Sequence, residues 1–107
     1  MTTDLYRRTI EWSEKKLDAE GHELTLKCWQ SRPWMVDAFT DGINSDRERE
    51  MNEWCRDNFG PEAWPIHGKP GDWYRGSATV YGWTHIGFAT VDMMNQFLAR
   101  WPAPETV

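Results

Sequence analysis

The sequence predicts an α+β domain in which helices pack on one face of a small antiparallel sheet. Its 107 residues are about the length of one domain. Stretches with helical spacing of apolar residues alternate along the chain with stretches in which every second residue is apolar. Their order is helix, strand, helix, strand, strand, helix, which favours helices laid on one small sheet. We expect a single domain over 1–107, with frayed ends at 1–2 and 103–107.

The first predicted helix covers residues 3–20. Apolar side chains follow helical spacing from Leu5 to Leu17, and Gly21 suits the position just past a helix end. A strand over 5–12 is the rival interpretation, because some apolar residues there alternate with charged ones.

A half-buried strand is predicted over residues 23–29, where Leu and Cys alternate with Thr and Lys. Residues 30–44 follow as a long connection, since Pro33 and Gly42 interrupt them. A purely solvated loop would not carry so many large apolar residues, so we expect this connection to pack or to bind something. Its large apolar residues are Trp34, Met35, Val36, Phe39 and Ile43.

The strongest helix pattern covers residues 46–59. Ser45 and Glu48 have the spacing of a capping box, in which the Ser hydroxyl accepts a backbone N–H and the Glu reaches back. Gly60 and Pro61 are typical of a helix end. The apolar face of this helix comprises Met51, Trp54, Cys55 and Phe59.

The last third of the chain predicts a hairpin and a helix. Residues 61–72 are a Pro- and Gly-rich loop, and 73–80 and 83–89 are expected to be strands joined by a tight turn at Tyr81-Gly82. A final helix is expected over 91–101, on helical spacing of apolar residues. With these elements the chain resembles a ferredoxin-like plait that lacks its last strand.

The charge balance excludes some classes of protein. The net charge is −5, whereas a protein that binds nucleic-acid phosphates needs an excess of Lys and Arg. No apolar run approaches the length of a membrane span, and the N-terminus lacks the pattern of a signal peptide. We therefore expect a cytoplasmic protein without direct contact to nucleic acid or membrane.

No residue pattern predicts a metal, a cofactor or an enzyme. The cysteines are isolated, the histidines are scattered, and no phosphate-binding, dinucleotide-binding or hydrolase motif is present. A triad of Cys55 with His67 or His85 and Asp72 can be drawn, but no local motif supports it. Cys28 and Cys55 both fall on predicted apolar faces, so we expect buried free thiols.

An acidic, Trp-containing surface is the predicted binding site. Seven acids stand against four bases between residues 31 and 57, and four of these acids share one face of the 46–59 helix. The surface would attract a basic partner protein, such as one whose own ligand is a nucleic acid. The alternatives are a face that only confers solubility and aromatic residues that only close the core. The candidate partner-binding residues are Trp34, Met35, Asp37, Phe39, Asp41, Asp46, Glu50, Glu53, Asp57 and Trp64.

Eight tryptophans in 107 residues exclude disorder. One small core does not easily hold eight indoles, because each needs a large apolar burial and a partner for its N–H. One interpretation is that most of them are core or half-buried sheet residues; the other is that two or three are anchors on a contact surface.

Parts of residues 54–101 resemble small phage and prophage proteins. The similar pieces are Trp54-Cys55-Arg56-Asp57-Asn58-Phe59-Gly60, Trp73-Tyr74-Arg75 and Phe88-Ala89-Thr90 with Phe97 and Trp101. The resemblance implies a short accessory phage protein that acts in a bacterial host, where such proteins inhibit restriction or CRISPR effectors. It implies no catalytic or ligand-binding residue. The predicted function is a non-enzymatic protein-binding inhibitor; the alternatives are an enzyme of unrecognised type and a virion structural or assembly component.

Overall fold

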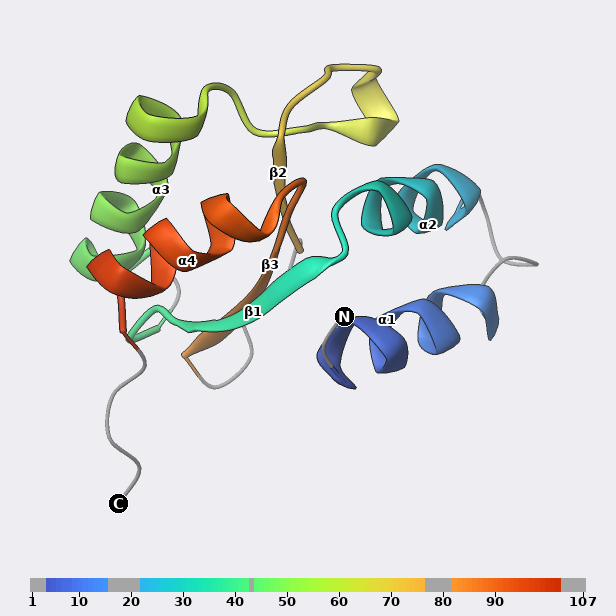
Figure 1. Ribbon diagram of the computed structural model, residues 1–107, viewed down its shortest axis with the longest axis horizontal. Coiled ribbons are helices and arrows are strands. Elements are labelled where there is room, and N and C mark those ends of the chain that lie inside the picture. Colours follow the sequence, from blue (N-terminus) through green and yellow to red (C-terminus); the bar gives the residue numbers. More distant parts are fainter. Residues whose placement is uncertain (1–3, 16–21, 43, 77–81, 103–107) are drawn as a thin grey trace.

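The computed structural model describes residues 4–15, 22–42, 44–76 and 82–102. In this part of the chain, helices lie around a three-stranded antiparallel sheet with strand order β1-β3-β2 (Figure 1). No helix in the described ranges is long and apolar enough to cross a membrane. The elements are α1 (Asp4–Lys15), α2 (His22–Ser31), β1 (Trp34–Phe39), α3 (Asp46–Phe59), the 3₁₀ turn η1 (Pro65–His67), β2 (Trp73–Arg75), β3 (Trp83–Phe88) and α4 (Val91–Arg100).

Strand β3 forms the centre of the sheet. Its Ile86 lies opposite Val36 of β1 on one side and Arg75 of β2 on the other. Helix α3 connects β1 to β2, so these outer strands form a β-α-β unit that β3 splits. The predicted α+β class is confirmed, and the strand order is the one a ferredoxin-like plait has without its last strand.

The main core lies between the sheet and the pair α3 and α4, which cover the same face (Figure 1). Phe88 of β3 packs edge-on against Phe59, with 5.6 Å between ring centroids, and in a tilted arrangement against Phe97 at 5.3 Å. Such aromatic contacts stabilise a core beyond the area that they bury. The buried cluster comprises Val36, Ala38, Met51, Cys55, Trp73, Ile86, Phe88, Phe97 and Trp101.

The ends of α3 confirm the predicted signals. The backbone N–H of Glu48 donates to Ser45 Oγ at 3.0 Å, and Glu48 Oε1 accepts the backbone N–H of Asn44 at 3.3 Å. The helix ends at Gly60, whose φ of 83° lies in the region that favours glycine and whose N–H donates to Arg56 O. The helix predicted over 91–101 is also confirmed, as α4.

The opposite face of the sheet is covered by α1 and α2, with α1 packed on β1 and on α2. A Cβ at Gly87 of β3 would come within 3.0 Å of the Trp29 ring and 2.7 Å of Arg32 O. The indole of Trp29 also meets the ring of Tyr74 at 4.6 Å. The predicted packing on one face therefore holds for α3 and α4, while α1 and α2 form a second layer.

The strand predicted over 23–29 is wrong, because this segment belongs to helix α2. Its alternation is real, but Leu26 and Trp29 are also three residues apart, which places both on one helical face; both are buried, while Leu24 is 51% exposed. Glu23 and Lys27 form an i,i+4 ion pair at 3.2 Å. The seven residues 23–29 are compatible with the period of a strand and with that of a helix. The side chains on the helical face are the ones that pack against the rest of the protein.

The long connection predicted over 30–44 is also wrong in part, because it contains strand β1. The strand begins directly after Pro33, where the missing N–H of proline disturbs no ladder. The helix predicted over 3–20 is described as far as Lys15. The described residues do not include 16–21, Tyr81 of the predicted turn, or the predicted frayed ends at 1–2 and 103–107.

Candidate functional site

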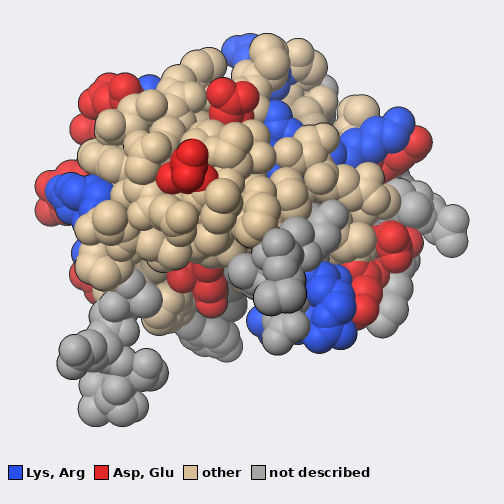
Figure 2. Space-filling model, viewed as in Figure 1, with Lys and Arg blue, Asp and Glu red and all other residues tan. Residues whose placement is uncertain are grey.

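The predicted acidic face of α3 lies on the surface. Asp46, Glu50, Glu53 and Asp57 are all exposed, and in Figure 2 acidic side chains stand at the edge of the molecule where Figure 1 shows α3, with basic ones beside them. Asp46 is paired with Arg49. The structure thus places three of these acids, from Glu50 to Asp57, where a partner's basic groups can reach them.

The predicted anchors on β1 do not form one patch. Successive residues of a strand point to opposite faces of the sheet, so Trp34 and Met35 cannot contact the same partner. Trp34 is half-buried against the main core, and Met35 on the other face is only 2% exposed. Neither side chain has the exposure that the sequence interpretation required, and Met35 is not available to a partner.

The remaining predicted residues around β1 are held locally. The Phe39 ring packs against Trp83 at 5.2 Å, and the guanidinium of Arg47 lies 5.5 Å from its centroid. Asp37 is exposed and lies 3.7 Å from His85 Nε2 on the neighbouring strand. Asp41 is exposed as well. The Phe39 ring is therefore held by its neighbours and is only partly exposed.

Trp64 is the predicted anchor that the structure does expose. Its exposed fraction is 50%, although it follows Ala63, which is buried. The backbone at Trp64 is fixed, because its N–H donates to Lys69 O at 2.9 Å and its carbonyl accepts the N–H of Lys69 at 3.0 Å. These two bonds close the turn around η1, so the indole stands on an ordered support.

The loop that carries Trp64 is attached to β2 and α2. The backbone N–H of Ala63 donates to Trp73 O at 2.8 Å, and the indole N–H of Trp73 donates to Gly60 O at 2.8 Å. Arg32 Nε donates to Gly71 O at 3.0 Å. At Gly71 a Cβ would lie 2.4 Å from backbone atoms of the facing loop segment, so only glycine permits this close approach.

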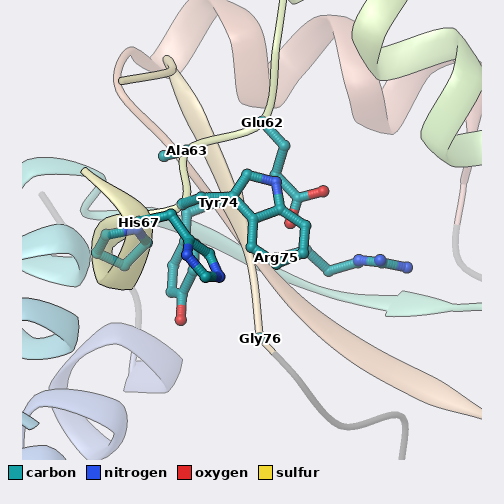
Figure 3. A pocket seen from close by; sticks show the side chains of 8 residues that line it. Glu62, Ala63, His67, Tyr74, Arg75 and Gly76 are labelled. Carbon is teal, nitrogen blue, oxygen red and sulfur yellow. The ribbon is translucent and has the colours of Figure 1, made fainter. Parts of the chain in front are cut away.

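A recess of about 250 Å³ lies beside Trp64, at the outer edge of β2. In Figure 3 the side chains of His67 and Tyr74 lie toward one end of it, and those of Glu62 and Arg75 toward the other. Tyr74 is fixed by Trp29 and by a side-chain hydrogen bond with Thr25. The lining residues are Glu62, Ala63, Trp64, Pro65, His67, Tyr74, Arg75 and Gly76.

The carboxylate of Glu62 is the charged group of the recess that burial most affects. Burial raises the pKa of Glu62 above its ordinary value, and the positive charges of Arg75 and Arg56 oppose this rise, as does a hydrogen bond from the backbone N–H of Arg75. Arg75 Nη1 also lies 3.8 Å from Glu48 Oε1. The positive charge of Arg75 therefore acts on both carboxylates.

The two thiols lie in the interior, and neither lines the recess. Cys55 is fully buried, and burial raises its pKa to about 12; burial also raises the pKa of Cys28. A protonated thiol is a poor nucleophile. The drawn triad is not assembled with His85, because α3 carries Cys55 on one face of the sheet while His85 points to the other. Among the described residues no three His, Cys, Asp or Glu side chains cluster as a metal site requires.

Sequence reasoning named Trp64 but missed Glu62, Tyr74 and Arg75. A usable signal was the alternation in Trp73-Tyr74-Arg75, which buries Trp73 and leaves its neighbours less buried. Nothing in the sequence indicates that Glu62 bridges to Trp73 at the edge of β2.

Comparison with known proteins returned no relative. Neither a protein-family model, nor a curated protein sequence, nor a solved structure matches this chain significantly. Its function has to be inferred from its own residues.

Proposed function

We propose that this protein is a non-enzymatic binding module that attaches to a basic surface of another protein through Trp64 and the acidic face of α3. The observation that carries the proposal is the half-exposed indole of Trp64 on a backbone closed by two hydrogen bonds with Lys69. An exposed aromatic group is an effective anchor when little conformational freedom remains to be lost on binding.

The charge of the molecule supports the choice of partner. The chain carries a net charge of −5, and Glu50, Glu53 and Asp57 are exposed on one side of α3. Exposed acidic residues on a protein accelerate its association with a basic partner and disfavour acidic ones.

The partner that suits this surface is a bacterial host protein whose own ligand is a nucleic acid. An acidic protein that occupies a basic groove prevents phosphates from entering it, so binding alone is sufficient for inhibition. A role against host defence, in the host cytoplasm, is what the resemblance of pieces of residues 54–101 to phage and prophage proteins implies.

Affinity capture from a bacterial lysate tests the proposal when wild type and variants are compared side by side. Trp64→Ala and the double variant Glu50→Lys/Glu53→Lys should each lose the protein that wild type captures. The matched controls are Leu24→Ala, an equally exposed apolar residue on α2, and Glu11→Lys/Glu14→Lys, an exposed pair with the same spacing on α1.

Interferometry with the captured protein then separates the two contributions. Charge reversal on α3 should lower the association rate and its dependence on salt, whereas Trp64→Ala should mainly raise the dissociation rate. Equal losses in the α1 controls would refute the proposed surface, and so would retention of the partner by both test variants.

A further inference from the structure

We propose that the recess beside Trp64 is a receptor for one arginine side chain of the partner, held between aromatic rings and the Glu62 carboxylate. The inference rests on the proposed function and names the group that the partner presents. It follows from the size of the recess, the chemistry of its walls and the balance of charge within it.

The size of the recess selects a side chain over a larger ligand. Pockets for drug-sized molecules and cofactors occupy about 300–1,000 Å³, whereas this recess has about 250 Å³. It is open to solvent beside the exposed indole of Trp64, so a group that projects from a protein surface can enter it.

The walls offer flat π surfaces. Trp64, Tyr74 and His67 all line the recess, and the rings of Trp64 and His67 lie 5.9 Å apart between centroids. A guanidinium is planar, weakly hydrated and stacks on aromatic faces, with Trp as the best partner. Tyr74 is held by Thr25 and Trp29, so this part of the wall is formed before a ligand arrives.

The charges favour a cation over an anion. Arg75 is the arginine that lines the recess. Its guanidinium is already paired with the carboxylate of Glu48 on α3, with 3.8 Å between Arg75 Nη1 and Glu48 Oε1. Glu62 in the same wall would repel an anionic ligand. Arg56 also acts on Glu62, but it is exposed on α3, where water screens its charge.

A bound cation stabilises a partly buried carboxylate more than it stabilises a carboxylate that water already solvates. Burial disfavours the charged form of Glu62 and raises its pKa, so an added positive charge compensates for lost solvation. An arginine also offers two parallel N–H donors to a carboxylate, and this geometry is stronger than a single contact.

The test uses small probes with the full-length chain, without the partner. N-acetyl-arginine amide is titrated into ¹⁵N-labelled protein at about 0.15 M salt, where exposed charges are largely screened. We expect saturable shifts of the Trp64 indole N–H and of the backbone amides of Glu62, Tyr74 and Arg75. N-acetyl-citrulline amide, a neutral molecule of nearly the same shape, should bind roughly tenfold more weakly or worse, and N-acetyl-lysine amide should lie between the two.

Variants decide whether the recess is responsible. Glu62→Gln keeps the shape and the hydrogen bond from the Arg75 backbone, and it should raise the Kd for the arginine probe roughly tenfold. Trp64→Ala should do the same, whereas Glu14→Gln, an exposed carboxylate on α1, should change nothing. All three variants keep the core intact, which their amide spectra will show.

Three outcomes would overturn the inference: equal binding of the arginine and citrulline probes, shifts that map to α3 instead of the recess, or an unchanged Kd in Glu62→Gln. The proposed function fails separately, when the capture experiment finds no partner that depends on Trp64. A partner lost with Trp64→Ala but retained by Glu62→Gln would leave the binding surface in place and exclude the arginine receptor.

Discussion

Replacing Met51 by alanine tests the packing of α3 against the sheet most directly. Met51 is 1% exposed and belongs to the cluster that contains Phe97 and Trp73. Truncation of a buried Met costs about 2–5 kcal/mol, because burial is lost and a cavity remains. Neighbours on α3, α4 and the sheet enclose this side chain, so little collapse can fill the space, and we expect about 3 kcal/mol.

The adjacent residue provides the matched control. Glu50 stands on the solvent side of the same helical turn, so Glu50→Ala should alter the free energy of unfolding by no more than about 0.5 kcal/mol. Urea titrations followed by tryptophan fluorescence and circular dichroism should show a lower midpoint for Met51→Ala and an unchanged m-value. The Tm should fall by about 12–24 °C, at about 4–8 °C per kcal/mol for a domain of this size.

A third variant separates packing from side-chain chemistry. Met51→Leu keeps most of the volume and should cost less than about 1.5 kcal/mol. Equal stabilities of Met51→Ala and Glu50→Ala would refute the orientation of α3, and with it the placement of the acidic face in solvent.

Two further predictions concern the helix cap and the thiols. Ser45→Ala should cost about 1 kcal/mol in the same titrations, because Ser45 Oγ accepts the N–H of Glu48; Ser45→Asp should restore most of it, and no loss in the alanine variant would contradict the cap. Both cysteines should react slowly with a thiol reagent in the native state and rapidly in urea. Since the folded pKa of Cys55 is about 12 against 9.0 for an ordinary thiol, its stabilisation is complete below pH 9 and is lost as pH rises toward 12. Wild type should therefore lose about 2 kcal/mol more than Cys55→Ala between pH 8 and about 10.5, and parallel losses would refute the shift.

Helix α3 was predictable because its signals are local. Ser45 and Glu48 define the start, Gly60 and Pro61 define the end, and every one of these lies within a few positions of the helix boundary. Such signals act through the backbone groups that a helix end leaves unpaired, so they operate whatever the rest of the chain does.

Helix α2 and strand β1 were missed because their identity depends on distant partners. The alternation of Leu24, Leu26 and Cys28 is as regular as in a strand, and only the packing of Trp29 on Gly87 reveals the helical face. In β1, both faces of the sheet are covered, so buried residues follow one another at Met35 and Val36 and the period of two disappears.

The acidic face of α3 could be predicted from local spacing, whereas the recess depends on contacts between distant residues. The regular spacing of the acidic residues along α3 was enough to predict that they share one exposed face, and they are exposed in the structure. The recess instead depends on the bridge between Glu62 and Trp73, on the close approach at Gly71 and on Arg32, which directly follows α2. None of these contacts leaves a periodic signal.

Trp64 was still identifiable, and the reason distinguishes it from the other tryptophans. A tryptophan in a helix or strand can turn its indole toward the neighbouring layer, and Trp29, Trp73 and Trp101 do so. Trp64 lies in a loop rich in Pro and Gly that runs along the outer edge of β2, and its indole is half exposed there. In a chain with more indoles than one core can bury, a tryptophan in such a loop can remain exposed. Among the tryptophans whose burial the structure describes, Trp64 is the exposed one, and it is therefore the residue from which the search for a partner should start.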